Sequence, residues 1–577
     1  MKRTASWLAV RALEELGVRY TFGIPGVHTT ELYDELNASE SVRPVLVTHE
    51  LSGAYMADAV SRLSTSVGTL AVVPAAGLTH AASGIAEALL DGIPMLVLSG
   101  GIRTDLPYGY QLHELDLHAF MRGITKATFH PKTHAEVQPM IYEAHRIAVS
   151  GEPGPVFVEL PVNLLLMPGE VGAPATYVPP EPPRIQDEAA ILAAAKLLLA
   201  AKRPGLFVGW GARGALAELT AIAEFLQAPV ATTLQGLSTF PATHPLHAGF
   251  GFGPAAVPAA RNAFAECDAM LAVGTRFAEI ATGSFGVTVP EALVHVDINP
   301  KVFNRNYPAK ITLEGDAETV LAALLLALRN GGLGRADDAG VAAAIVRDKA
   351  AYRDTWLAHD PKGRVNAQRF FDALSAGTPP DAITVIDDGN HTYLTAELYP
   401  VRTAGSVILP TDFNSMGYAV PAALGAALVH PGRHVNAIVG DGAFAMTCME
   451  IATGVAQGLG VCYWVFHDGE LSQIAQAQEI PYNRKPCAEL PPLRLEGIAM
   501  ATGAGYLRID NDAALAASIA QAHRLAAAGQ PVIVDVMIDY SKRTAFTQGA
   551  VKTNLKRLPL RQKLRMVARA LLRRITG

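Results

Sequence analysis

The fold is decided by the stretch from Val439 to Gln473, which reads VGDGAFAMTCMEIATGVAQGLGVCYWVFHDGELSQ. It alternates an apolar strand, an acidic turn, a helix, a second apolar strand and a second acidic turn. Asp441 and Asp468 stand directly after the two strands, and parallel strands present ligands at their carboxyl ends. Because Mg²⁺ prefers oxygen ligands, these carboxylates and the carbonyl of Glu470 predict a magnesium site that holds a diphosphate.

A Gly-Asp-Gly sequence on its own is more often a tight turn than a ligand site. Here Gly440 and Gly442 flank Asp441, so the backbone can approach a ligand closely. The second acidic turn, at the end of the next strand, favours the ligand site over a simple turn.

Short apolar runs alternate with helical stretches along the whole chain, for example RPVLVTHE, GTLAVVPA, RPGLFVGWG and DAMLAVGTRF. Strands that are apolar on both faces are typical of parallel sheets covered by helices. Pro- and Gly-rich residues 168–183 and Ala- and Gly-rich residues 331–363 predict linkers. The sequence therefore predicts an α/β protein with three doubly wound parallel-sheet domains. Their predicted bounds are 1–167, 184–330 and 364–540, followed by a basic helical tail over 541–577.

Composition narrows the functional classes. Of the 577 residues, 50% are hydrophobic and 17% are charged, which indicates a globular protein too long for one core. The net charge of −6 argues against nucleic acid as the main partner. The four cysteines show no CxxC spacing, the first helix is too polar for a signal peptide, and no apolar run is long enough to cross a bilayer. We expect a cytoplasmic protein, at most peripheral to a membrane.

The two acidic turns resemble the diphosphate signature of the thiamine-diphosphate enzymes that include acetolactate synthases, pyruvate oxidases and 2-hydroxyacyl-CoA lyases. In that superfamily a Gly-Asp-Gly is followed, at the next strand end, by an Asn-Asn pair whose second residue binds the metal. Here the second turn carries His467 and Asp468, which keeps an oxygen ligand but adds a charge. The resemblance also implies that Glu50, in VLVTHELSGAYMADAVSR, is the acid that protonates a pyrimidine nitrogen of the cofactor.

Further segments carry the same resemblance, including TFGIPG, DDGNHT and SMGYAVPAALGAA. It implies a pyrimidine-binding domain, a central Rossmann-like domain and a diphosphate-binding domain, with thiamine diphosphate and Mg²⁺ as cofactors. It also implies a homodimer or homotetramer, because Glu50 of one chain must meet Asp441 of another. The residues implied to contact the cofactor are Pro25, Gly26, Glu50, Asn390, His391, Met416, Gly440, Gly442 and Ala443.

The choice of reaction depends on positions that depart from individual members. Gln473 and Ala477 replace the methionine and tryptophan of acetolactate synthases. His113 stands where a glutamine faces the cofactor, so it is either a proton shuttle or a hydrogen-bonded loop residue. The resemblance favours an acetolactate-synthase-like, decarboxylating carboligase acting on a 2-oxo acid. The alternatives are a 2-hydroxyacyl-CoA lyase, a pyruvate-oxidase-like flavoenzyme, and a catalytically silent regulatory subunit that binds thiamine diphosphate or a nucleotide.

Two regions leave alternatives open. In the central domain, Arg276 and glycine turns suit a phosphate or a structural core, and the changed segment GFGFGPAA weighs against FAD without removing it as a candidate cofactor. From Val551 onward there are nine Lys or Arg residues and no acid, with apolar residues at helical spacing from Leu560 to Ile575. Such a basic amphipathic helix packs on its own protein, closes over the site as a lid, or lies on an anionic membrane.

Overall fold

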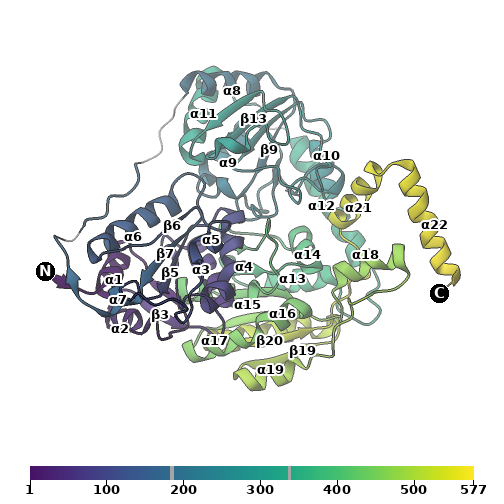
Figure 1. The fold of residues 1–577 in the computed structure, drawn as a ribbon. Helices are drawn as coiled ribbons and strands as arrows, with labels where there is room; N and C mark the ends of the chain where they lie inside the picture. The colour runs from purple at the N-terminus through teal and green to yellow at the C-terminus, as the bar shows by residue number, and fades with distance from the viewer. Residues whose placement is uncertain (174, 182–186, 336–338, 577) are drawn as a thin grey trace.

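Three parallel sheets of six strands, one in each third of the chain, form the protein in the computed structural model (Figure 1). The structure describes residues 1–173, 175–181, 187–335 and 339–576. The predicted α/β class with three parallel-sheet units is therefore confirmed. The predicted domain bounds stay predictions, and the predicted linker over 168–183 falls partly outside the described ranges.

The first sheet lies between residues 20 and 161. Its strands are β2 (Tyr20–Gly23), β3 (Arg43–Leu46), β4 (Gly68–Val72), β5 (Met95–Gly101), β6 (Ala127–Phe129) and β7 (Pro155–Pro161), in the spatial order β3-β2-β4-β5-β7-β6. Its helices are α1 (Ala5–Glu15), α2 (Thr30–Ala38), α3 (Glu50–Leu63), α4 (Ala76–Asp91), α5 (Leu117–Met121), α6 (His134–Val149) and α7 (Val162–Leu166). Every residue of β5 and β7 is buried, as expected for strands covered on both faces. Two short strands, β1 (Lys2–Arg3) and β8 (Gly169–Glu170), pair antiparallel beside this sheet.

The central sheet has the order β11-β10-β9-β12-β13-β14, the doubly wound arrangement of dinucleotide-binding folds. Its strands are β9 (Pro204–Val208), β10 (Val230–Thr232), β11 (His247–Phe250), β12 (Ala269–Val273), β13 (Ala292–Asp297) and β14 (Ile311–Glu314). Helices α8 (Glu188–Ala200), α9 (Leu216–Leu226), α10 (Pro258–Phe264) and α11 (Ala317–Gly331) cover it. The predicted Rossmann-like topology is confirmed.

The third sheet repeats the strand order of the first. Its strands are β15 (Ile383–Ile386), β16 (Val407–Ile408), β17 (Val435–Gly440), β18 (Val461–Phe466), β19 (Gly505–Ile509) and β20 (Val532–Val536), in the order β16-β15-β17-β18-β20-β19. Its helices are α13 (Ala367–Gly377), α14 (Asn390–Leu398), α15 (Ala419–Val429), α16 (Asp441–Thr447), α17 (Ile451–Gln457), α18 (Ser472–Tyr482), α19 (Leu495–Thr502) and α20 (Leu515–Ala527). The chain order reverses between β15 and β17, where open α/β sheets bind their ligands.

Helices α3 and α15 pack against each other and hold the first and third units together. Every residue of α15 is buried, and its sequence is apolar on all sides. The two backbones approach closely because residue 425 is glycine: a Cβ on Gly425 would lie 2.6 Å from the carbonyl oxygen of Met56.

A buried charged cluster strengthens this interface. The Arg62 guanidinium contacts Asp58 at 2.6 Å and Asp91 at 2.8 Å, and the three side chains are fully buried. Arg62 also donates to the carbonyl oxygen of Leu409, and the Tyr418 hydroxyl donates to Asp58. One cation from α3 therefore satisfies two carboxylates and a carbonyl that belong to different parts of the chain.

We expect Arg62→Met to lower the free energy of unfolding by about 3–5 kcal/mol, because two buried carboxylates lose their partner. Urea denaturation followed by circular dichroism measures the change. As the control, Arg11→Met removes an exposed ion pair and should change the free energy by less than about 1 kcal/mol. Equal effects of the two substitutions would contradict the proposed strength of the buried cluster.

One sequence prediction is wrong. Residues 331–363, expected to be a linker, contain helix α12 (Ala339–Leu357), and the side chains of Ile345 and Trp356 are buried. The glycines suggested a linker, but alanines dominate this stretch, and alanine has the highest helix propensity. Ile345 packs in the core of the central unit and Trp356 in the core of the third.

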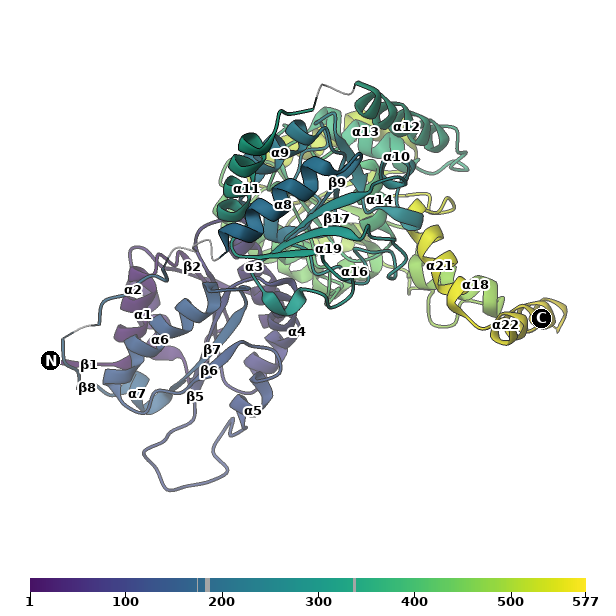
Figure 2. The ribbon, with the colours of Figure 1, turned by 90° about the horizontal axis from the view of Figure 1, so that it is seen from above.

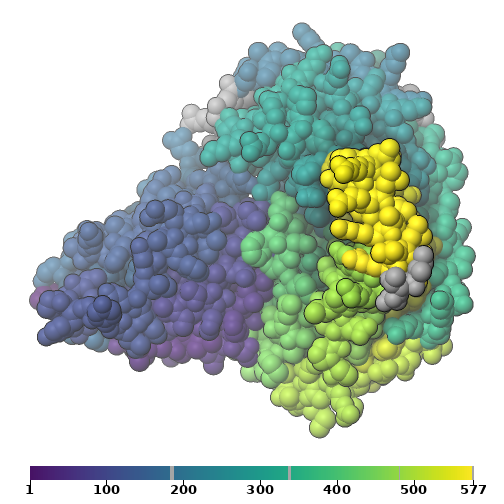
Figure 3. Space-filling model, turned by 45° about the vertical axis from the view of Figure 1, so that its right-hand side comes forward, coloured from purple at the N-terminus to yellow at the C-terminus, as the bar shows by residue number. Residues whose placement is uncertain are grey.

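The C-terminal tail forms two helices, α21 (Ala545–Arg557) and α22 (Leu560–Thr576), on the outside of the molecule (Figure 3). Phe546 of α21 stacks on Tyr393 with ring centroids 4.4 Å apart, so α21 is part of the body. In α22, Leu560, Leu564, Val567, Leu571 and Leu572 remain exposed, and the side chain of Ile575 lies outside the described ones. Within the described ranges, every helix is too short or too polar to span a membrane.

Candidate active site

A cavity of about 240 Å³ opens at the carboxyl ends of β15, β17 and β18. All the residues predicted as ligands in the third unit line it, namely Asn390, His391, Met416, Gly440, Asp441, Gly442, Ala443, Asp468 and Glu470. The strand order brings them together, because β15, β17 and β18 are neighbours in the sheet. Several further residues line the cavity without having been predicted as ligands, among them Asp388, Ser472 and Tyr540. Only Asp388, in the DDGN motif, carried a signal that could have identified it.

The two acidic turns lie side by side at this edge. Strands β17 and β18 are parallel and in register, with Gly440 opposite Phe466. The Asp441 carboxylate accepts hydrogen bonds from the backbone N–H groups of Gly442 and Gly469, each at 2.8 Å. The Asp441 carboxylate therefore connects the first acidic turn to the second by a hydrogen bond. Asp468 accepts a hydrogen bond from the Ser472 hydroxyl.

The electrostatics of these carboxylates suit a cation. Burial raises the pKa of Asp441 above its usual range and that of Asp468 to about 6. The Asp441 charge also raises the pKa of Asp468, and no cationic side chain lines the cavity among the described residues. A buried carboxylate beside a half-buried one whose pKa it raises, together with the backbone carbonyl of Glu470, is a donor set for a hard divalent cation. The residues present therefore fit Mg²⁺.

Two polar atoms in the cavity lack hydrogen-bond partners among the described residues. They are Nε2 of His391 and Oδ1 of Asp388, and both are buried. Burial lowers the pKa of His391 to about 3, so its imidazole is neutral. Its ring lies against the backbone, where a Cβ on Gly440 would approach it to 3.1 Å. Because buried polar atoms are normally paired, both atoms indicate a polar ligand, and a neutral imidazole N–H suits a phosphate oxygen.

His467, in the second acidic turn, lies between Asp535 of β20 and Asp441. Its Nδ1 lies 2.8 Å from Asp535 and its Nε2 lies 3.9 Å from Asp441. The hydrogen bond to Asp535 raises the pKa of His467. Its position makes it a positioning residue for Asp441.

The predicted residues of the first unit do not reach this cavity: among the described residues, Pro25, Gly26, Glu50 and His113 are not part of its lining. Glu50 is the first residue of α3 and is buried. Its carboxylate lies 3.0 Å from Nδ1 of His80. One chain therefore carries two separate groups of predicted residues.

His113 lies on the long segment between β5 and α5, which projects from the first unit (Figure 2). Its backbone has a positive φ of 69°, which is uncommon for a residue with a side chain. Its ring lies 5.0 Å from that of His28, and its buried Nδ1 has no hydrogen-bond partner in the described part of the chain. His113 is therefore not a satisfied loop histidine within a single chain.

In the central unit, the predicted phosphate-binding features already have protein partners. Arg276 lies 3.4 Å from Glu152 and 3.0 Å from Asp412. The glycine turns pack on each other, since a Cβ on Gly209 would lie 2.2 Å from the carbonyl oxygen of Gly274. These contacts support the structural role that sequence analysis left open.

Comparison with family models gives three matches, in order along the chain. The N-terminal TPP binding domain of thiamine pyrophosphate enzymes matches residues 3–120, the central domain matches 191–324, and the C-terminal TPP binding domain matches 387–536. Thiamine pyrophosphate is another name for thiamine diphosphate. The third match includes all the residues predicted to bind the diphosphate and the metal.

Several characterised or named proteins are similar over most of their length. The acetolactate synthase large subunit of Corynebacterium glutamicum is 31% identical over 490 residues, covering 83% of this chain and 77% of the relative. The acetolactate synthase isozyme 3 large subunit of Escherichia coli is 30% identical over 555 residues, covering 93% and 95%. A probable 2-ketoarginine decarboxylase of Pseudomonas aeruginosa is 34% identical over 453 residues, covering 78% and 79%.

Proposed function

The chain belongs to the thiamine pyrophosphate enzymes, and from this premise we infer that it is a decarboxylating carboligase acting on a 2-oxo acid, as acetolactate synthases do. The observation that carries the proposal is the cavity in which Asp441 and Asp468 lie at adjacent strand ends. Similarity to two acetolactate synthases over most of the chain supports the choice of reaction.

Each group of residues has a role in this proposal. Asp441, Asp468 and the Glu470 carbonyl would hold Mg²⁺, and His391, Asn390, Gly442 and Ala443 would hold the diphosphate. When bound, thiamine diphosphate supplies a nucleophilic carbon and accepts the electrons of the bond that breaks. Met416 would support the cofactor by apolar contact, and Glu50 would exchange a proton with its pyrimidine nitrogen. His113 would face the substrate and act as a proton shuttle.

The separation of Glu50 from the Asp441 cavity supports a homodimer, or a tetramer built from such dimers. The Glu50 group is in the first unit and the Asp441 cavity in the third, and no described residue of the first unit lines the cavity. A second copy related by two-fold symmetry can present its Glu50 to the cavity of the first, and the reverse. The proposed active site is therefore shared between chains.

The test is to incubate purified protein with thiamine diphosphate, Mg²⁺ and pyruvate, and to measure CO₂ and acetolactate. We expect bound cofactor and both products. Cofactor binding with no turnover of pyruvate or longer 2-oxo acids would overturn the carboligase and favour the regulatory subunit. Turnover of a 2-hydroxyacyl-CoA instead would favour the lyase, and a bound yellow flavin with peroxide formation would favour the oxidase.

A second candidate is decarboxylation of a 2-oxo acid with a cationic side chain. The Asp388 carboxylate, with its unpartnered Oδ1, would pair with that cation. Burial raises the pKa of Asp388 only to about 6, so it is largely ionised near pH 7. The relative named as a probable 2-ketoarginine decarboxylase supports this candidate. The decarboxylase would be favoured over the carboligase if the protein turns over 2-ketoarginine faster than pyruvate. Asp388→Asn should then abolish this preference for 2-ketoarginine.

Helix α22 supports peripheral binding to an anionic membrane. It carries six Arg or Lys residues and no acid, and its leucines are exposed. Its end contacts the body through Arg573, which donates to the Pro481 carbonyl and lies over the ring of Tyr482. Exposed apolar residues beside basic ones complement a surface of acidic lipid.

We expect deletion of residues 559–577 to abolish binding to vesicles that contain phosphatidylserine, since each basic residue contributes about 1 kcal/mol at such a surface. Co-sedimentation measures it, with neutral vesicles as the lipid control. The deletion leaves α21 intact, so the fold and cofactor binding should be unchanged. Full vesicle binding by the shortened chain would rule out α22 as the contact.

A further inference from the structure

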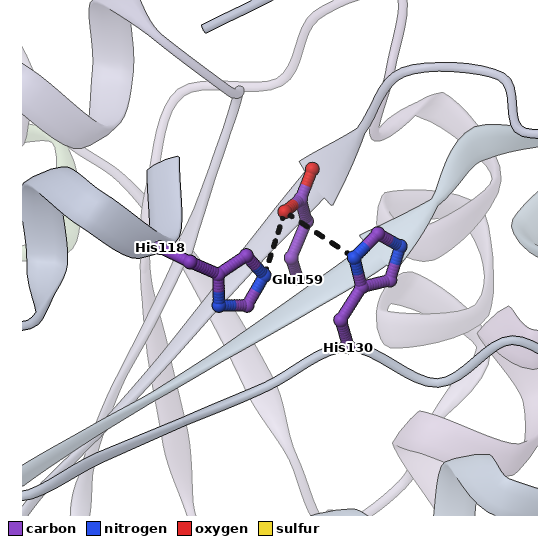
Figure 4. Close-up of side chains that lie close together, drawn as sticks. All are labelled: His118, His130 and Glu159. Carbon is purple, nitrogen blue, oxygen red and sulfur yellow. Dashed lines mark ion pairs between the residues drawn. The ribbon is translucent and has the colours of Figure 1, made fainter. Parts of the chain in front are cut away.

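A histidine-rich cluster in the first unit is separate from every residue assigned above. It consists of His118 on α5, His130 just after β6, and Glu159 on β7 (Figure 4). Oε2 of Glu159 lies 3.0 Å from Nε2 of His118 and 3.9 Å from Nδ1 of His130. The three candidate ligand atoms lie within 4.8 Å of one another. Helix α5, the residue after β6, and strand β7 therefore bring two imidazoles and one carboxylate close together.

The contact between His118 and Glu159 is close but is not a hydrogen bond. Nε2 of His118 is buried and has no hydrogen-bond partner among the described residues, although Glu159 is 3.0 Å away. A donor and an acceptor at that distance would normally align a proton between them. Nε2 of His118 and the Glu159 carboxylate are close together but are not aligned for a hydrogen bond. Two ligands of one metal ion have this arrangement.

The surroundings favour the metal-binding form of His130 and leave room for the Glu159 carboxylate. Burial lowers the pKa of His130 despite the nearby carboxylate, so its imidazole is neutral near pH 7. Glu159 is 7% exposed, and its carboxylate fits only because residue 101 is glycine: a Cβ there would lie 2.7 Å from Oε1. Neutral imidazoles and an ionised carboxylate are the forms that bind metals.

We propose that His118, His130 and Glu159 bind a divalent metal of the zinc class. Zinc bonds to nitrogen and oxygen are about 2.0–2.2 Å long, which places the ligand atoms of a tetrahedral site about 3.4 Å apart. Two of the three separations between the ligand atoms, 3.0 and 3.9 Å, bracket that value, and the third is within 4.8 Å. Two imidazoles and one carboxylate leave a fourth position for water or another ligand.

The metal would anchor the segment that carries His113. This segment runs from the end of β5, at Gly101, to the start of α5, and both of its ends meet at the cluster. Tyr108, Tyr110 and Leu112 within it are exposed, while Thr104 is hydrogen-bonded to Asn163 and Gln111 to the backbone of the segment itself. A metal bound to His118 and Glu159 fixes the base of the segment, and zinc should make residues 102–116 more resistant to proteolysis.

The test uses the full chain with thiamine diphosphate and excess Mg²⁺, so that the diphosphate site is not open to the probe. Zinc is added, unbound metal is removed by dialysis, and zinc per chain is measured by mass spectrometry. We expect wild type to retain one more zinc per chain than the double variant His118→Ala/His130→Ala. Glu159→Gln, which keeps the shape of the side chain, should weaken zinc binding at least about tenfold.

His244→Ala is the matched control, because His244 also lies near a glutamate, Glu224 at 3.4 Å, but belongs to no group of three candidate metal ligands among the described residues. It should retain the same zinc as wild type. Circular dichroism establishes that each variant is folded, and limited proteolysis of residues 102–116 gives a second readout. Equal zinc in wild type, Glu159→Gln and the double variant would overturn the site. Zinc that binds without slowing proteolysis would overturn the anchoring role.

Discussion

Glu50→Gln is expected to lower kcat for the 2-oxo acid by about 10²–10⁴-fold, the usual contribution of a positioned acid or base. The substitution keeps the shape of the buried side chain but removes the carboxyl proton that would be exchanged with the pyrimidine nitrogen. It leaves the Asp441 cavity intact, because Glu50 does not line it. Steady-state turnover gives the loss of activity, and calorimetry should show retained binding of thiamine diphosphate.

Glu31→Gln on α2 is the control, since the Glu31 carboxylate accepts a hydrogen bond from the neighbouring Thr30 hydroxyl and does not line the cavity, so turnover should be unchanged. If Glu50→Gln retains wild-type turnover, the assignment of Glu50 as the proton-exchanging residue is wrong. His80→Asn adds a comparison, because His80 contacts the Glu50 carboxylate and should affect turnover less than Glu50→Gln.

Asp441→Ala is expected to reduce the affinity for thiamine diphosphate in Mg²⁺ by at least about 100-fold, more than the loss of an outer-shell partner would cause. It removes a candidate metal ligand and the acceptor that ties the second turn to the first through Gly469. Calorimetric titration of the cofactor, with and without Mg²⁺, measures the effect. The difference between the two titrations should disappear in the variant, since Mg²⁺ would no longer be held.

Asp381→Ala, an exposed aspartate of the same unit, should leave cofactor affinity unchanged. Wild-type affinity in Asp441→Ala would place the metal elsewhere. The two inactive variants also test the shared site: a heterodimer of Glu50→Gln and Asp441→Ala, isolated through two different tags, has one fully intact site of two. About half of wild-type activity is expected if sites form across chains, and none if each site forms within one chain.

Local sequence patterns were sufficient to predict the fold class and the part of the site that lies in the third unit. Runs of apolar residues that alternate with helical stretches specify parallel sheets, because both faces of such strands are covered. Asp441 and Asp468 could be predicted as neighbours because each directly follows a strand, and the carboxyl ends of adjacent parallel strands meet. These inferences need only local patterns and their order along the chain.

Features that depend on packing between distant segments became visible in the folded protein. The tertiary structure placed Glu50 against His80 and outside the cavity, turned a predicted linker into α12, and paired Arg276 with Glu152 and Asp412. The cluster of His118, His130 and Glu159 has no recognisable spacing in the sequence, because its members come from three elements. Such contacts are set by which side chains the folded sheets bring together and by the glycines that leave room for them, and neither can be read from a local pattern.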